Sequence, residues 1–117
     1  MLKEFMSRIR DQVSSNIEKY IGDSNFIEGA MKYSALAESK MFRAALVFAS
    51  GDLNNNISNK SLINLSTSIE LMHTYSLIHD DLPSMDNDEL RRGQDSSHIK
   101  FGEANAILVG DALQALS

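Results

Sequence analysis

Apolar residues recur at every third or fourth position over long stretches of this chain, and this spacing constrains the fold more than any other feature. In the first twenty residues the apolar positions are Leu2, Phe5, Ile9, Val13, Ile17 and Tyr20. Such positions share one face of an α-helix, whereas a half-buried β-strand needs strict alternation of apolar and polar residues. We therefore expect an amphipathic helix over the first twenty residues, ending at Gly22.

Two shorter helices are predicted to follow. Asn25 and Glu28 have the spacing of a capping box, which opens a helix through about Leu36. A third helix stops at Gly51 and carries its apolar residues on one side. These residues are Phe42, Leu46 and Ala49. The asparagine-rich segment 52–59 is then expected to form a loop.

The remaining sequence predicts two more helices and one irregular region. A long helix is expected from about Ser61 to an acidic cluster at Asp80, and a last helix begins near Glu103. Residues 82–102 contain the only proline and many polar groups, so we expect loop or broken helix there. No strand pattern is visible. The chain is therefore predicted to be all-α, with residues 1–117 in a single domain.

The long helix carries two opposite stripes. The polar stripe consists of Glu70, His73, Leu77 and Asp80 or Asp81. The apolar stripe, expected to anchor the helix in the core, consists of Leu62, Leu65, Ile69 and Met72. A polar stripe that ends in paired aspartates suits the wall of a hydrated cavity, although a solvated helix face would show the same residues.

The paired aspartates indicate a cation site. Asp80 and Asp81 repel each other at the negative end of the helix dipole, which a bound cation would relieve. Hard oxygen ligands favour Mg²⁺ or Ca²⁺ over zinc. We expect Pro83 to break the helix, so that Asp86 returns towards the metal. An ordinary solvated acidic helix end would contain similar residues.

Two arginines follow this cluster. Arg91 and Arg92 either neutralise the nearby carboxylates or grip phosphate groups with their planar forks. Metal-binding aspartates and phosphate-binding arginines in one segment favour the metal-assisted binding of a phosphorylated small molecule.

The composition excludes several classes of protein. A net charge of −5 without any basic run argues against a nucleic-acid-binding protein. The absence of cysteine excludes a disulfide framework and suits the cytoplasm, where we expect the protein to reside. Charged residues interrupt the N-terminal segment, so no signal peptide is predicted, and no apolar run approaches a membrane span.

The segment from Glu70 to Gly93 closely resembles the first aspartate-rich region of bacterial farnesyl diphosphate synthases, or geranyltranstransferases. It reads Glu70-Leu-Met-His73-Thr-Tyr75-Ser76-Leu-Ile-His79-Asp80-Asp81-Leu-Pro83-Ser-Met-Asp86-Asn-Asp88-Glu-Leu-Arg91-Arg92-Gly93. The segment Phe101-Gly102-Glu103-Ala104 to Leu113 is also similar to that family, and the similarity covers about residues 33–117. The resemblance implies the helical bundle of isoprenoid synthases and a prenyl transfer assisted by Mg²⁺.

The resemblance also implies roles for individual residues. Asp80 and Asp86, with Asp81, would hold Mg²⁺ that bridges the diphosphate of an allylic substrate, dimethylallyl or geranyl diphosphate, and Arg91 would contact the same diphosphate. The residues implied to bind isopentenyl diphosphate are Lys40, Arg43, His73 and Arg92. Tyr75 and Ser76 precede the aspartates, where the family closes its product pocket, and Tyr75 is similar to the pattern that gives a C15 product. Tyr75 as a plain core aromatic is the other interpretation.

Two motifs depart from the family pattern. Where the family has Gly-Gly-Lys-Arg-x-Arg-Pro, this chain reads Glu38-Ser39-Lys40-Met41-Phe42-Arg43-Ala44. The family's Gly-Lys-Pro-Thr becomes Gly93-Gln94-Asp95-Ser96. Both changes remove positive charge or backbone freedom near the expected isopentenyl diphosphate site, which puts tight binding there in question.

The second aspartate-rich motif of the family has no counterpart after Arg92. We therefore expect the chain to be the N-terminal half of the enzyme, inactive alone, with exposed apolar helix faces that favour self-association and a homodimer. Two alternatives remain. One is a non-catalytic helical interaction fragment. The other is a carboxylate-bridged di-iron bundle, suggested by the spacing of Glu70 and His73 but lacking a second copy of that pair.

Overall fold

The computed structural model describes all residues 1–117 and contains six helices and one short hairpin. The elements are α1 (Leu2–Tyr20), α2 (Phe26–Ala35), α3 (Phe42–Gly51), α4 (Asn59–Asp80), β1 (Leu90–Arg91), β2 (Gln94–Asp95), α5 (Ser97–Phe101) and α6 (Glu103–Leu116). The predicted all-α class is confirmed. The expectation of no strand is wrong in one place, because β1 and β2 pair as two-residue antiparallel strands.

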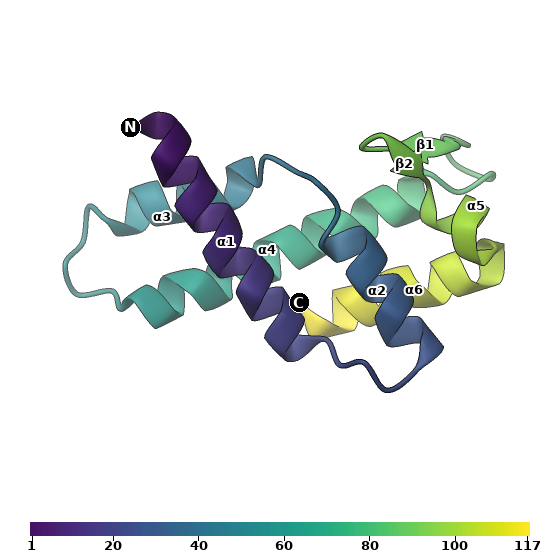
Figure 1. The fold of residues 1–117 in the computed structure, drawn as a ribbon, viewed down its shortest axis with the longest axis horizontal. Coiled ribbons are helices and arrows are strands. Elements are labelled where there is room, and N and C mark those ends of the chain that lie inside the picture. Colours follow the sequence, from purple (N-terminus) through teal and green to yellow (C-terminus); the bar gives the residue numbers. More distant parts are fainter.

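Helix α4 is the centre of the fold. Figure 1 shows it running through the middle of the molecule, with α1 and α2 crossing it and α6 beside it. Helix α3 lies by its N-terminal half, and the hairpin and α5 lie near its C-terminal end (Figure 1). The segment with the expected chemistry is therefore supported by four other helices.

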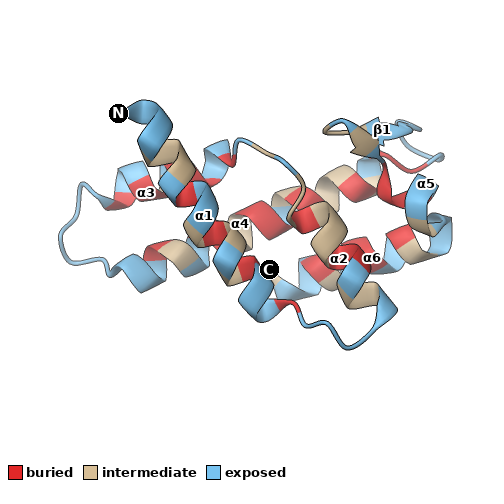
Figure 2. Ribbon diagram, in the orientation of Figure 1, coloured by how far each residue is buried: buried red, intermediate tan, exposed pale blue.

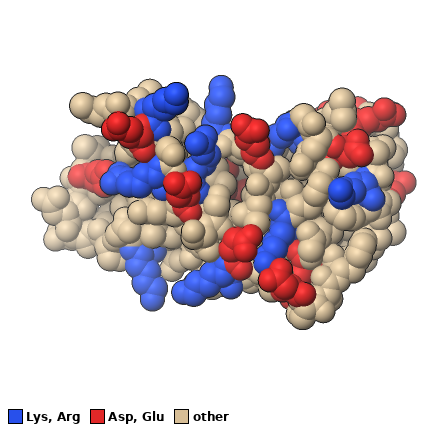
Figure 3. Space-filling model, in the orientation of Figure 1, with Lys and Arg blue, Asp and Glu red and all other residues tan.

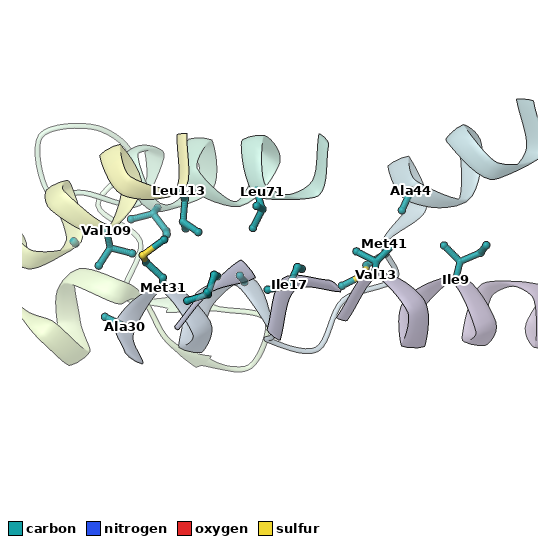
Figure 4. Packing of buried hydrophobic residues seen from close by; sticks show 14 of the residues in the cluster. Ile9, Val13, Ile17, Ala30, Met31, Met41, Ala44, Leu71, Val109 and Leu113 are labelled. Atoms are coloured by element: carbon teal, nitrogen blue, oxygen red, sulfur yellow. The ribbon is translucent and has the colours of Figure 1, made fainter. Parts of the chain in front are cut away.

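The apolar core is continuous along this axis. Ile9, Val13 and Ile17 of α1 contribute to the same buried cluster as Val109 and Leu113 of α6 (Figure 4). Figure 2 shows that the buried positions follow α4 and the places where α1, α2 and α6 cover it. None of the helices has the length and apolar character needed to cross a bilayer.

The start of α2 follows the predicted capping box in part. The side-chain oxygen of Asn25 accepts the backbone N–H of Glu28 at 2.9 Å, as expected. The Glu28 carboxylate, however, accepts the backbone N–H of Ser24 at 2.7 Å and the Ser24 hydroxyl at 2.9 Å. These hydrogen bonds lower the pKa of Glu28. In a capping box Glu28 would accept the backbone N–H of Asn25, so this bond has moved one residue towards the N-terminus, to Ser24.

The predicted core stripe of α4 is wrong. Leu65 and Met72 are 52% and 50% exposed, and of that stripe only Leu62 is fully buried. The core face of α4 instead consists of Leu62, Ser66, Thr67, Glu70, Leu71, Thr74 and Ile78. The threonines can lie there because they satisfy their donors within the helix: Thr67 donates to the Ile63 carbonyl and Thr74 to the Glu70 carbonyl, each at 2.8 Å.

The face predicted for α3 is also solvent-exposed. Phe42 and Leu46 are 61% and 52% exposed. Ala44, Ala45 and Phe48 face the core in their place. Both helices therefore have a second apolar face that the rest of the chain leaves uncovered.

Candidate diphosphate and metal site

Helix α4 ends at Asp80, and the chain after it folds back onto the helix end. The backbone N–H of Asp86 donates to the Asp80 carbonyl at 2.8 Å, and the N–H of Asp88 donates to the Asp81 carbonyl at 3.1 Å. Asn87 adopts a positive φ of 52° in this turn. The loop brings the backbone of Asp86 next to that of Asp80, although six residues separate them along the chain.

The three aspartates have different environments. Asp80 and Asp86 are exposed, whereas Asp81 is only 2% exposed. The Asp81 carboxylate accepts two hydrogen bonds from the Arg91 guanidinium, through Nε and Nη2. This pair raises the pKa of Arg91 further above its usual value. Asp81 therefore fixes the position of Arg91, and Asp80 and Asp86 are the carboxylates free to meet a ligand.

The donor set fits Mg²⁺ when a phosphate ligand completes its shell. No three carboxylate or imidazole groups converge closely enough to hold a cation alone. Mg²⁺ in proteins often takes only one or two carboxylates, together with water and substrate phosphate oxygens. Asp80 and Asp86 provide two such carboxylates from adjoining parts of the backbone.

A basic groove of about 760 Å³ lies along the polar stripe of α4. It brings together every residue expected at the isopentenyl diphosphate site and adds Arg10 of α1. The basic side chains and imidazole that line it are Arg10, Lys40, Arg43, His73, Arg91 and Arg92. Figure 3 shows Lys and Arg side chains over the N-terminal half of α1 and between this helix and the hairpin, mixed with carboxylates.

Within the groove, His73 interacts with a neighbouring cation. Its Nε2 lies 3.4 Å from Arg43 Nη1. Because a guanidinium can only donate, Nε2 must be the acceptor, and this requires an unprotonated Nε2. Burial first and the charge of Arg43 second lower the pKa of His73. The imidazole is therefore neutral at pH 7, with its other nitrogen free to donate.

The hairpin presents the two arginines to α4. Leu90 pairs with Asp95, and Arg91 pairs with Gln94, so the connecting turn consists of Arg92 and Gly93. Both turn residues have positive φ, 55° and 77°. This is the φ pattern of the I′ turns preferred in two-residue hairpin loops. The Arg-Gly pair was therefore a turn signal that the sequence interpretation missed.

The altered residues after Gly93 anchor the hairpin to α2. The Tyr33 hydroxyl donates to the Asp95 carbonyl at 2.9 Å, and the Gln94 side-chain amide donates to the Tyr33 carbonyl at 3.4 Å. Phe101 packs edge-on against the Tyr33 ring at 5.1 Å between centroids. Tyr33 thus supports the arginine turn from behind, a role that the sequence did not reveal.

Glu70 has a role that sequence reasoning also missed. It is 4% exposed, and its Oε1 accepts the backbone N–H of Ala44 at 2.9 Å. Ala44 is in the first turn of α3, where Met41 has a left-handed φ of 48° and offers no side-chain cap. The α4 carboxylate therefore caps α3 across the helix interface and holds the turn that carries Lys40 and Arg43.

Tyr75 and Ser76 lie one turn before the aspartates but outside the basic groove. The partly buried Tyr75 ring packs edge-on against His79 at 5.8 Å. The Ser76 hydroxyl donates to the His73 carbonyl at 2.7 Å. His79 contacts α6, where its Nε2 lies 3.1 Å from the Ile107 carbonyl. Tyr75 is therefore beside the α4–α6 interface.

Comparison with known proteins places this geometry in a family. The family model described as polyprenyl synthetase matches residues 24–117. A farnesyl diphosphate synthase of Buchnera aphidicola is 42% identical over all of this chain and 41% of its own length. The Escherichia coli farnesyl diphosphate synthase is 53% identical over 74% of this chain and 29% of its own length.

Solved structures of prenyl synthases have the same fold as this chain. An FPP/GFPP synthase from Zymomonas mobilis superposes with a TM-score of 0.93 at 38% identity, over 98% of this chain and 42% of that protein. A geranyltranstransferase from Thermotoga maritima gives a TM-score of 0.88 at 37% identity, over 95% of this chain and 42% of that protein. The chain thus spans between 29% and 42% of the length of these relatives. With a match over most of its residues and a fold shared along nearly its whole length, the chain belongs to the polyprenyl synthetase family.

Proposed function

We propose that residues 1–117 are the N-terminal part of a farnesyl diphosphate synthase, which joins an allylic diphosphate to isopentenyl diphosphate. The observation that carries the proposal is a groove lined by unpaired cations, which Arg91 connects to the acidic end of α4 through its hydrogen bonds to Asp81. Lys40, Arg43 and Arg92 line one groove, and none lies within 4.0 Å of a carboxylate oxygen. In a protein of net charge −5, several cations gathered in one groove favour an anionic ligand there.

Each group has a part in this proposal. Asp80 and Asp86 would hold Mg²⁺ against the allylic diphosphate, and the ion, when bound, supplies positive charge for the departing diphosphate. Arg91, oriented by Asp81, would contact the same diphosphate. Lys40, Arg43, Arg92 and the free nitrogen of neutral His73 would bind isopentenyl diphosphate. Preorganised donors of this kind stabilise developing charge without reorganisation.

Tyr75 supports a C15 product in this proposal. Its ring lies about one turn before Asp80 on α4 and is held edge-on against His79. An aromatic ring held at this position on α4 would limit the length of a product chain that extends along the helix from the aspartates. Replacement of Tyr75 by alanine in the full-length enzyme should therefore yield products longer than C15, detected by chromatography of the hydrolysed alcohols.

Binding of inorganic pyrophosphate to this chain tests the site without requiring catalysis. We expect calorimetry to detect binding that tightens with Mg²⁺. Changing a residue that only supports a metal ligand typically costs about 10- to 100-fold in metal affinity, so Asp80→Ala should lower the Mg²⁺-dependent component of pyrophosphate binding by at least about tenfold. Asp52→Ala is the matched control, because that exposed carboxylate follows α3 and lies outside the basic groove and the arginine hairpin. A pyrophosphate affinity that changes neither with Asp80→Ala nor with Mg²⁺ would refute the metal assignment.

Turnover tests the enzyme class. The full-length protein should form farnesyl diphosphate from geranyl and isopentenyl diphosphates with Mg²⁺, and the 117-residue chain alone should not. Removing a single preorganised charge contact typically costs about 10²–10³ in rate. The chain alone would lack every such contact that the rest of the full-length enzyme makes with the substrates. Robust turnover by the chain alone would contradict this expectation.

A non-catalytic role as a helical interaction module is the second candidate. The exposed apolar faces of α3 and α4, which include Phe42, Leu46 and Leu65, favour it. Such a module would bind helical protein and would have no need of the basic groove. Failure to bind pyrophosphate with and without Mg²⁺ would support this candidate over the synthase.

A further inference from the structure

We propose that Arg10 of α1 is a ligand of the diphosphate bound in the basic groove, replacing the cation that this chain lacks at position 41. The inference rests on the proposed function and adds a residue from outside the aspartate-rich and lysine-containing motifs. It assigns a binding role to the N-terminal helix, which the sequence interpretation treated only as an amphipathic support.

Position 41 contributes packing in place of charge. Met41 is 6% exposed and belongs to the same apolar cluster as Val13 and Ala44 (Figure 4). Its left-handed φ of 48° sets the turn between Lys40 and α3. The segment therefore supplies only Lys40 and Arg43 to the groove.

Arg10 lies where it can supply the positive charge that is absent at position 41. Ile9 and Val13 are 1% and 0% exposed and fasten α1 to the core. Arg10 follows Ile9 directly and is exposed, so the core holds its backbone while its side chain reaches solvent. It lines the basic groove together with Lys40 and Arg43.

No carboxylate neutralises Arg10. Two carboxylates line the same groove, Glu38 and Glu70, and neither lies within 4.0 Å of its guanidinium. Glu70 is buried and already accepts the Ala44 N–H. An unpaired guanidinium at the mouth of a cationic groove presents a planar fork that matches phosphate oxygens.

Pyrophosphate binding without metal isolates this contact from Asp80 and Asp86. Arg10→Ala should weaken binding by about five- to tenfold, the range for a charge-assisted hydrogen bond discounted for exposure. Arg10→Lys should recover only part of the affinity, because the fork is lost. Lys19→Ala is the matched control: it removes the same charge from the same helix about 13 Å away, beyond the Debye length at moderate salt.

The outcomes separate this inference from the proposed function. Weakening by Lys40→Ala and Arg43→Ala but not by Arg10→Ala would overturn the role of Arg10 and leave the proposed site intact. Equal weakening by Arg10→Ala and Lys19→Ala would reduce the effect to net charge and also overturn it. Binding unaffected by Lys40→Ala and Arg43→Ala would refute the site itself. Circular dichroism of every variant checks that the helices are retained.

Discussion

At the residue scale, single side chains in this site act through neighbours distant in sequence. Glu70 and Ala44 are 26 residues apart, yet one hydrogen bond joins them and sets the start of α3. Arg91 and Asp81 are ten residues apart and fix the hairpin to the end of α4. Two buried carboxylates thus position parts of the groove, Asp81 through Arg91 and Glu70 through the start of α3.

Glu70→Ala should destabilise the fold by about 1–3 kcal/mol, because it leaves the buried Ala44 N–H without an acceptor. Glu70→Gln should recover most of this loss, since its amide oxygen can accept the same bond. Chemical denaturation of the chain measures the difference. Glu38→Ala, at an exposed position beside the groove, is the control and should change little. Equal losses at positions 38 and 70 would contradict the capping role.

His73 should titrate below the ordinary histidine pKa of 6.5, because burial and Arg43 disfavour its charged form. The folded state then binds fewer protons than the unfolded state between the two pKa values. His73 therefore contributes stability that is present above pH 6.5 and is lost as the pH falls through its folded pKa. Histidine NMR titration should show this shift, and Arg43→Ala should reduce it. A His73 pKa that is not lowered would count against the contact with Arg43.

At the element scale, the β1–β2 hairpin decides where the arginines point. Its two-residue turn needs positive φ at Arg92 and Gly93, and Tyr33 of α2 holds its second strand. The residues that departed from the family pattern, Gln94 and Asp95, belong to this anchored strand. Their backbone and amide contacts give the segment a defined position without the expected lysine or proline.

Gly93→Ala should destabilise the hairpin by about 1 kcal/mol, because a Cβ is strained at φ 77° even though the space around it is open. Pyrophosphate binding should weaken in parallel as the arginine turn loosens. Gly29→Ala in α2 is the paired control: the space there is also open, and the helical backbone should gain about 0.5–1 kcal/mol. Thermal unfolding distinguishes the two, and the same sign of change in both variants would contradict the turn assignment.

At the scale of the whole molecule, much apolar surface is left uncovered. Leu46 of α3, Leu65 and Met72 of α4 and Leu108 of α6 are each about half exposed. The relatives with this fold are more than twice as long as the chain. Large exposed apolar patches generally mark surfaces that bind other protein.

The isolated chain should therefore self-associate, and sedimentation equilibrium should give a mass above that of one chain, increasing with concentration. Leu46→Glu and Leu65→Glu should shift the distribution towards the monomer, because a charge on an apolar interface is costly to bury. Leu53→Glu changes an exposed loop leucine in the same way and should leave association unchanged. A monomer at all concentrations would contradict the homodimer expectation.

Local sequence signals determined the helices and the segment that carries the chemistry. Capping residues, apolar periodicity and Gly51 located α1, α2 and α3 to within a few residues, because each signal acts within one or two helical turns. The proximity of Arg91 to the acidic end of α4 was also predictable, since a short loop joins Arg91 to Asp81.

Tertiary structure alone decided which helix faces are buried and which charges meet. The apolar stripe of α4 was misassigned because burial depends on where α1, α3 and α6 pack, and small hydroxyl residues let those helices approach closely. Glu70 meets Ala44, and Arg10 meets the groove of Lys40, only through that packing. Side-chain partners across helices depend on long-range geometry, which a 3.6-residue repeat does not encode.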